Sequence, residues 1–248
     1  MNIVNNSTVS LVDSMGSDLS VVNAARVSFA KESDWEETPF VDHNKEPIKE
    51  LSAKDQKLIK YLAEHGHWSP FAHTSLTFRI KAPIFVARQL VKHQVGGVWN
   101  EVSRRYVDDE PEFYFPLVWR RKAENVKQGS SNTRCEYMYI EQWDGSEGIY
   151  GSDQATPENM LYRHTNDALR WYQDIVRNGV APEQARMVLP QNTMTEWWWT
   201  GSLMFFARVC KQRLDAHAQQ ETREVAEQID KLIPDVFKHS WEYLRKTN

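Results

Sequence analysis

The stretch His65–Gln94, HGHWSPFAHTSLTFRIKAPIFVARQLVKHQ, carries the two patterns that decide the fold. Within it, Thr74–Ile80 alternates apolar and polar residues, which is the period of a half-buried β-strand. Lys81–His93 follows with helical spacing, and Pro83 stands near its start, where proline is tolerated. The Gly-Gly pair at 96–97 marks the end of that helix. The stretch therefore predicts a strand followed directly by a helix.

Further elements are expected on both sides of this stretch. Apolar residues recur there at alternating or helical spacing, and Gly or Pro marks several boundaries. The expected elements are a strand at Thr8–Val12 and helices at Leu19–Ser28, Ser52–His65, Pro157–Gly179, Ala181–Leu189 and Ser202–Leu232. This balance predicts the α+β class, a single domain with a small, mostly antiparallel sheet and long helices.

A polar stretch separates two groups of expected elements. Residues 125–157 are rich in Gly, Ser, Asn and Asp. This composition is typical of a surface loop. We therefore expect a mobile loop or lid at 125–157, inside one domain that spans residues 1–248.

The composition limits the class of protein. With 248 residues, of which 41% are hydrophobic and 26% charged, the chain has ordinary values for a globular protein with a substantial core. Its net charge of −4 gives no general attraction to nucleic acid or to anionic membranes. The start lacks a signal-peptide pattern, and no apolar run is long enough to span a bilayer. We expect a cytoplasmic protein with no nucleic-acid or membrane partner.

Neither the cysteines nor the clustered histidines indicate a structural metal or a disulfide framework. Cys135 and Cys210 form no CxxC motif, and no obvious local base accompanies either, so packing roles are expected. The spacing of His65, His67 and His73 matches no zinc template. These histidines are expected to pack with hydrogen bonds or to line a ligand pocket.

Residues suited to binding an anion gather in Gln89–Tyr106, QLVKHQVGGVWNEVSRRY. The chain has no glycine-rich phosphate loop, so side chains would have to bind a phosphate. Arginine binds phosphate oxygens in pairs and serine adds a short donor, groups that Ser103, Arg104 and Arg105 offer. A solvated surface turn is the more common role for such a tripeptide, and both interpretations stay open.

A third cluster lies on the last expected helix. Arg213, His217 and Glu221 recur every fourth residue and would share one helical face. An ion-pair ladder on a solvated helix is the ordinary interpretation, and a ligand-binding face is the alternative. The three tryptophans at 197–199 are expected to pack in the core or a subunit interface rather than to stack on a ligand.

Taken together, these clusters closely resemble the flavin-dependent thymidylate synthase family. Six stretches keep the family's order from near the N-terminus to the last helix, so the resemblance covers nearly the whole chain. They are AARVSF (Ala24–Phe29), HGHWSPFAHTSLTF (His65–Phe78), KAPIFVARQLVKHQ (Lys81–Gln94), NEVSRRY (Asn100–Tyr106), ARMVLP (Ala185–Pro190) and RLDAHAQQE (Arg213–Glu221).

The chain departs from the family pattern around the flavin. The family's usual Arg-His-Arg triplet is Lys92-His93-Gln94 here, which removes one positive charge. Two positions that are commonly asparagine in the family are Ser202 and Arg208, and Arg208 offers a replacement for the charge lost at Gln94. We expect weaker retention of FAD than in typical relatives.

The resemblance implies a role for individual residues. It implies that dUMP is held by Gln89, Lys92, Glu101, Ser103, Arg104, Arg105, Arg186 and Arg213. It implies that FAD is surrounded by His67, Ser69, Lys92, His93, Gln94, Glu101, Ser202, Arg208 and His217. Arg213 would be catalytic, because its guanidinium can stabilise negative charge on uracil as N3 loses its proton. No metal is implied.

The resemblance also implies a reaction and an assembly. In the family, NADPH reduces FAD, the methylene of 5,10-methylenetetrahydrofolate passes to C5 of dUMP, and a hydride from the flavin completes dTMP. The family uses no cysteine nucleophile, which agrees with the settings of Cys135 and Cys210. It is a homotetramer whose sites draw on several subunits.

Two alternatives to this activity remain. A related flavin-dependent dUMP hydroxymethylase completes the transfer with water, and the altered triplet keeps this alternative open. A catalytically inactive nucleotide-binding scaffold is expected to lose dUMP residues, yet Gln89, Glu101, Ser103, Arg105 and Arg213 are all present. A nucleic-acid-binding module is disfavoured by the net charge and by the lack of an extended basic stripe.

Overall fold

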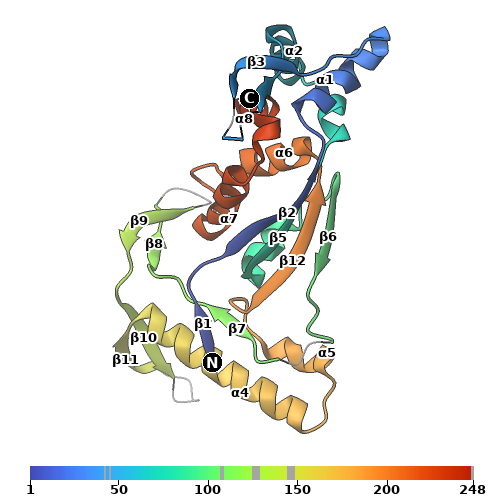
Figure 1. The fold of residues 1–248 in the computed structure, drawn as a ribbon. Coiled ribbons are helices and arrows are strands. Elements are labelled where there is room, and N and C mark those ends of the chain that lie inside the picture. The colour runs from blue at the N-terminus through green and yellow to red at the C-terminus, as the bar shows by residue number, and fades with distance from the viewer. Residues whose placement is uncertain (42, 45, 107–108, 125–128, 144–148, 247–248) are drawn as a thin grey trace.

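An antiparallel sheet of four strands forms the centre of the molecule (Figure 1). The computed structural model describes residues 1–246 except 42, 45, 107–108, 125–128 and 144–148. The strand order is β2 (Thr8–Met15), β5 (Ser75–Pro83), β12 (Met194–Gly201) and β6 (Gly97–Glu101). The expected α+β class is confirmed, as are the strands predicted near residues 8 and 74. Local pattern does not predict β6 or β12.

One face of the sheet is buried and the other is not. Trp197 and Trp199 of β12 are 1% exposed, whereas Trp198 between them is 50% exposed. This alternation follows from the pleat, which sends successive side chains to opposite faces. Core packing, as predicted, is confirmed for Trp197 and Trp199, and Trp198 lies on the opposite face.

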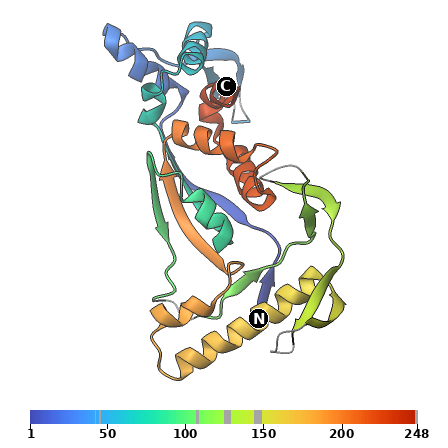
Figure 2. The same cartoon turned by 180° about the vertical axis from the view of Figure 1, so that it is seen from behind.

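Three helices cover the buried face: α3 (Ile84–Leu90), α6 (Leu203–Arg213) and α7 (Gln220–Lys231). Figure 2 shows them from the other side, beside the long strands. Two glycines allow α6 to approach closely. A Cβ atom on Gly97 or Gly201, which pair across β6 and β12, would lie 2.4 or 2.3 Å from the ring of Phe205. Glycine at both positions therefore lets Phe205 pack on the sheet.

A second group of helices packs at the end of the molecule where the chain terminates (Figure 1). It consists of α1 (Asp18–Arg26), α2 (Ala53–Glu64) and α8 (Lys238–Lys246), beside the hairpin of β3 (Glu36–Val41) and β4 (Pro47–Glu50). The helices predicted at Leu19–Ser28 and Ser52–His65 are confirmed. Gly66, with φ +67°, follows α2 in a conformation that L side chains rarely adopt.

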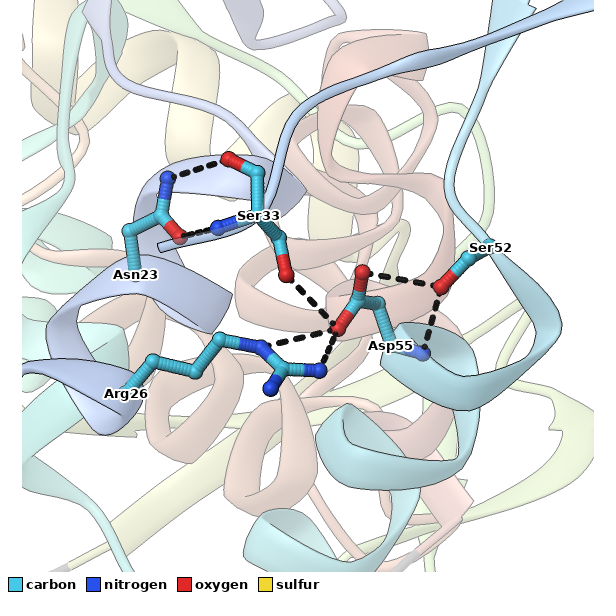
Figure 3. A network of polar contacts seen from close by, with 5 residues as sticks. All are labelled: Asn23, Arg26, Ser33, Ser52 and Asp55. Atoms are coloured by element: carbon cyan, nitrogen blue, oxygen red, sulfur yellow. Dashed lines mark hydrogen bonds and ion pairs between the residues drawn. The ribbon is translucent and has the colours of Figure 1, made fainter. Parts of the chain in front are cut away.

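A buried ion pair fastens α1 to the start of α2 (Figure 3). Arg26 of the AARVSF stretch binds Asp55, and their side chains are 14% and 4% exposed. Asp55 also accepts hydrogen bonds from Ser33 Oγ at 3.2 Å and from Ser52 Oγ at 2.9 Å. Asn23 donates to the Ser33 carbonyl at 3.0 Å. The network fixes the connection between the two helices, so Arg26 has a structural role here.

The rest of the chain forms two more helices and several short strands. The helices predicted at Pro157–Gly179 and Ala181–Leu189 correspond to α4 (Pro157–Arg177) and to α5 (Pro182–Ala185) with the 3₁₀ turn that follows it. In the part of the chain that the structure describes, no helix is long and apolar enough to cross a membrane. The short strands are β1 (Asn2–Val4), β7 (Glu112–Tyr114), β8 (Arg120–Lys122), β9 (Ser130–Arg134), β10 (Met138–Trp143) and β11 (Ile149–Ala155).

Three predictions from local pattern need correction. The helix expected over Lys81–His93 is only α3, because Lys81–Pro83 continue β5 and pair with β12. Most of the expected loop at 125–157 consists of β9, β10 and β11. Polar residues in these strands conceal the pairing, which depends on partners elsewhere in the chain. Residues 125–128 and 144–148 of this stretch lie outside the described residues, and its mobility stays a prediction.

The single helix expected over Ser202–Leu232 is wrong, because α6 ends at Arg213 and α7 begins at Gln220. The carboxylate of Asp215 accepts a hydrogen bond from the backbone N–H of His217 at 2.8 Å. Such local side-chain bonds compete with the hydrogen bonds of a continuous helix. Arg213, His217 and Glu221 therefore do not share one helical face.

Candidate active site

Arg213 brings together the ends of α3 and α6. Its Nε donates to Nε2 of His93 at 3.0 Å, and its Nη2 donates to the backbone carbonyl of Gln89 at 3.1 Å. A histidine nitrogen that accepts from a guanidinium must be unprotonated, so His93 is neutral and carries its proton on Nδ1. Burial, and then the charges of Arg213 and Arg208, lower the pKa of His93 to about 4.

The half-buried guanidinium of Arg213 keeps its charge. Burial lowers its pKa, but arginine is not deprotonated in proteins. The ion-pair ladder considered from the sequence is wrong, because Glu221 has another partner, and so does the neighbouring carboxylate of Asp215. Glu221 pairs with Arg120 at 2.8 Å, and Asp215 pairs with His217 at 3.0 Å. The Arg213 charge thus lies beside a neutral imidazole and a carbonyl.

The side chain of Gln89 is held at both ends of its amide. Its Nε2 donates to Oε1 of Gln219, and its Oε1 accepts from Oγ1 of Thr222 at 3.2 Å. Gln219 and Thr222 lie at the start of α7, which is more than a hundred residues away in sequence. Only the packing of α3 on α7 reveals these partners.

A pocket of about 910 Å³ lies at the Gly97 end of the sheet. Its lining is mostly apolar and includes the exposed Trp68, with Ser202 and Arg208 among its polar residues. Ser202 also begins α6, where its Oγ accepts from the backbone N–H of Phe205 at 3.2 Å. Arg208 donates to the carbonyl of Val95 at 2.7 Å. The pocket size suits a cofactor or a similar small molecule.

The remaining flavin candidates are exposed, and Glu101 among them lies at the other end of β6. Lys92 and Gln94 flank His93 just after α3 ends. His67 and Ser69 stand beside Trp68, and the ring of His67 lies 5.7 Å from that of Tyr61. His217, in the turn between α6 and α7, bonds to Asp215.

The anion-binding candidates form a separate group at the far end of β6. A smaller pocket of about 340 Å³ there is lined by Glu101, Arg104 and Arg186 among others. The carboxylate of Glu101 accepts from Thr195 Oγ1 at 2.8 Å and from Trp99 Nε1 at 3.1 Å.

Ser103 and the arginines beside it are tied to their own segment. The hydroxyl of Ser103 accepts from Nε of Arg105 at 3.0 Å, and Arg104 donates to the carbonyl of Asp109 at 2.5 Å. Arg186 donates to the carbonyl of Glu183 at 3.2 Å. The acceptors in these bonds are carbonyl and hydroxyl oxygens and not carboxylates. These bonds therefore leave the positive charge of each guanidinium group available to bind an anion.

One chain therefore brings the sequence-predicted residues into two groups. Gln89, His93, Arg208 and Arg213 lie together, and Glu101, Arg104 and Arg186 lie together. Gly97 and Glu101, at the two ends of β6, are roughly 13 Å apart at about 3.3 Å per residue. Sequence reasoning missed Arg120, Gln219 and Thr222 as partners. Gln219 lies inside the RLDAHAQQE stretch, whereas nothing near Arg120 in sequence signals its role.

Comparison with known proteins gives consistent relatives. Residues 10–237 match the family described as thymidylate synthase complementing protein. The flavin-dependent thymidylate synthase of Thermosipho melanesiensis is 34% identical over 238 residues, which cover 96% of this chain and 90% of that protein. The flavin-dependent thymidylate synthase of Thermus thermophilus is 36% identical over 233 residues, which cover 94% and 73%.

A solved structure resembles the whole fold. The crystal structure of the UMP/dUMP methylase PolB from Streptomyces cacaoi, bound with 5-Br dUMP, has a TM-score of 0.75 to this chain at 29% sequence identity. The match covers 100% of this chain and 98% of the neighbour. The two groups of residues around Arg213 and around Arg104 thus belong to a fold that, in the neighbour, holds a pyrimidine nucleotide.

Proposed function

The chain belongs to the flavin-dependent thymidylate synthase family, and from this membership we propose that it methylates dUMP at C5 to make dTMP. One observation of the structure carries the proposal. Arg213 places a permanent positive charge next to neutral His93 and Gln89. No carboxylate of α7 pairs with this guanidinium, and Glu221 pairs with Arg120 instead. A fixed cation in a half-buried site stabilises the anion that uracil forms when N3 loses its proton, which makes C5 a better nucleophile.

The second group of residues is proposed to bind the nucleotide. Arg104, Arg105 and Arg186 supply guanidinium groups for the phosphate, and Ser103 supplies a hydroxyl. Glu101 accepts two hydrogen bonds from its own chain and has lone pairs left for a donor of the substrate. Gln89 and Lys92 complete the set from α3 and its end.

The residues at the Gly97 end of the sheet fit a flavin. The pocket of about 910 Å³ is large and mostly apolar, and Arg208 in its lining can bind a phosphate of FAD. We propose that Ser202, Arg208, His67, Ser69, Lys92, His93 and Gln94 surround FAD, with His217 near it, and that Glu101, which lies at the far end of β6, is supplied by another subunit. When bound and reduced, FAD supplies the hydride that completes the methyl group. The chain's residues position the ring and exclude water from it.

The co-substrates follow from the family, and the compartment is proposed with them. NADPH serves as reductant and 5,10-methylenetetrahydrofolate as carbon donor. The working location is proposed to be the cytoplasm, where both are present. The hydroxymethylase alternative is not favoured by the relatives, which are thymidylate synthases.

We further propose a homotetramer whose active sites combine residues of different subunits. The separation of the Arg213 group from the Arg104 and Arg186 group within one chain supports it. The unburied sheet face supports it too, because Trp198 and Val98 lie there with 50% and 65% exposure. Light scattering at micromolar concentration is expected to give the mass of four chains, and a stable monomer would contradict the assembly.

The activity is tested by product analysis. Protein supplied with FAD, NADPH and 5,10-methylenetetrahydrofolate is expected to convert dUMP to dTMP, identified by mass spectrometry. UMP belongs in a parallel reaction, because the Streptomyces cacaoi neighbour is a UMP/dUMP methylase. A product with the mass of 5-hydroxymethyl-dUMP would favour the hydroxymethylase. No product from either nucleotide, with FAD bound, would favour the inactive scaffold.

A further inference from the structure

A chain of hydrogen bonds joins the β8–β9 hairpin to Gln89. Arg120 of β8 donates from Nε to Ser130 of β9 at 2.7 Å, and from Nη2 to Oε1 of Glu221 at 2.8 Å. Oε2 of Glu221 accepts from Nε2 of Gln219 at 2.9 Å. Oε1 of Gln219 in turn accepts from Nε2 of Gln89. The hairpin is therefore connected to Gln89, a residue of the nucleotide site proposed above, through the side chains of Glu221 and Gln219.

One carboxylate sets the direction of the bonds that lead from Glu221 to Gln89. An ionised Glu221 can only accept, so it must face the NH₂ group of Gln219. The carbonyl of Gln219 then faces away from Glu221, toward Gln89, and the NH₂ group of Gln89 must turn to meet it. Thr222 completes the arrangement by donating to Oε1 of Gln89. The two amides thus have one orientation rather than two.

Arg120 keeps Glu221 in its ionised form. Glu221 is 6% exposed, and burial alone would raise its pKa, but hydrogen bonds from Arg120 and Gln219 and the charge of Arg120 lower the pKa overall. A buried pair of this kind contributes little net stability compared with apolar packing. Its known use in other proteins is to specify one arrangement of its surroundings.

We propose that Glu221, held by Arg120, is a positioning residue that fixes the donor–acceptor orientation of the Gln89 amide through Gln219. The proposal rests on the proposed function, in which Gln89 binds dUMP. Gln219 takes one of the two N–H donors of Gln89 and leaves the second in a defined direction for the nucleotide. The Gln89 backbone carbonyl also binds Arg213, so the same residue connects the pair to the catalytic guanidinium.

Glu221→Gln is the test variant, because it keeps the shape of the side chain and removes the charge that orients Gln219. The new amide can bond to Gln219 through either its NH₂ group or its carbonyl oxygen. The amide of Gln219, and with it the amide of Gln89, can then flip. We expect the Kd and KM for dUMP to rise about tenfold, as for loss of one well-placed hydrogen bond. FAD affinity and kcat at saturating dUMP are expected to stay close to wild type. A general loss of structure would not separate KM from kcat and FAD binding in this way.

Asp55→Asn provides a matched control. It neutralises the carboxylate of the Arg26–Asp55 pair, which is as buried as Arg120–Glu221 but belongs to the α1–α2 connection. It is expected to lower stability without changing dUMP affinity in protein shown to be folded by circular dichroism. Arg120→Lys keeps a cation beside Glu221 and is expected to retain most of the affinity.

A double-mutant cycle tests the route through Gln219. Glu221→Gln is expected to have no further effect on dUMP affinity in a Gln219→Ala background, because the link is already broken. Three outcomes would overturn this inference but not the proposed function. They are wild-type affinity in Glu221→Gln, an undiminished effect of Glu221→Gln in the Gln219→Ala background, and equal weakening of dUMP binding by Asp55→Asn. Failure of the wild type to bind dUMP would overturn the proposed function together with it.

Discussion

The Nε atom of Arg213 lies 3.0 Å from Nε2 of His93, although the two residues are 120 positions apart in the chain. The contact joins the residue proposed for catalysis to a residue proposed for the flavin. Because the guanidinium donates, the imidazole must be neutral for the bond to exist. The protonation of His93 and the position of Arg213 are therefore linked.

His93 is expected to titrate far below an ordinary histidine. Burial and the charges of Arg213 and Arg208 lower its pKa from 6.5 to about 4, so it stays neutral through the physiological range. Arg213→Met removes one of these charges and is expected to raise the pKa toward 6.5. Imidazole NMR signals followed against pH measure both values. An unchanged pKa in Arg213→Met would contradict the contact.

Arg213→Ala is expected to lose about a hundredfold to a thousandfold in dTMP formation, as when a donor is removed from a developing charge. Arg213→Lys keeps the charge but loses the planar fork that binds His93 and the Gln89 carbonyl together, so it should also be strongly impaired. Turnover is measured at saturating dUMP, folate, NADPH and FAD, and FAD binding serves as the control. Near-normal turnover of Arg213→Ala would remove Arg213 from the chemistry.

Arg186→Ala is expected to weaken dUMP binding about tenfold to a hundredfold, the range for a lost hydrogen bond to a charged group. The reason is the loss of one cation from the pocket that also holds Arg104 and Glu101. Deoxyuridine, which lacks the phosphate, should bind wild type and variant equally weakly. A similar loss of affinity for deoxyuridine would show that Arg186 contacts another part of the nucleotide.

Gln94→Arg restores the family's second positive charge beside His93 and is expected to tighten FAD binding about threefold to tenfold. Titration calorimetry of apoprotein with FAD measures the change. Arg208 is the alternative source of that charge, since it lies close enough to lower the pKa of His93. Unchanged affinity in Gln94→Arg, together with a large loss in Arg208→Ala, would assign the compensation to Arg208.

Asp55→Asn is expected to lower the free energy of unfolding by about 3 kcal/mol, because it leaves Arg26 without its partner. Burial raises the pKa of Asp55, but hydrogen bonds from Arg26, Ser52 and Ser33 outweigh it and lower the pKa below 3.8. The folded state thus binds this proton less tightly than the unfolded state. The stabilisation is fully present above pH 3.8, and it is lost as the pH falls through the lower pKa that Asp55 has in the folded state.

Denaturant titrations at several pH values measure this dependence. Wild type is expected to lose stability more steeply than Asp55→Asn below about pH 4. Equal slopes for the two proteins would show that the pair does not hold Asp55 ionised.

Local sequence determined the elements whose signals are short-range. The alternation of Thr74–Ile80 predicted most of β5, and helical spacing with Gly or Pro at the boundaries predicted α2 and α4, because a helix or a half-buried strand shows its period in its own residues. The six family stretches also identified the residues worth testing. Length and order along the chain, however, say nothing about which of these residues touch.

Tertiary structure decided the rest. Trp197 and Trp199 lie in a strand because β5 and β6 flank them, and Lys81–Pro83 remain extended because β12 pairs with them. The turn at Asp215 ends α6, so Glu221 turns to Arg120 instead of Arg213. These outcomes depend on hydrogen bonds and burial between segments far apart in sequence, which no local pattern contains. The contact of Arg213 with His93 is of the same kind.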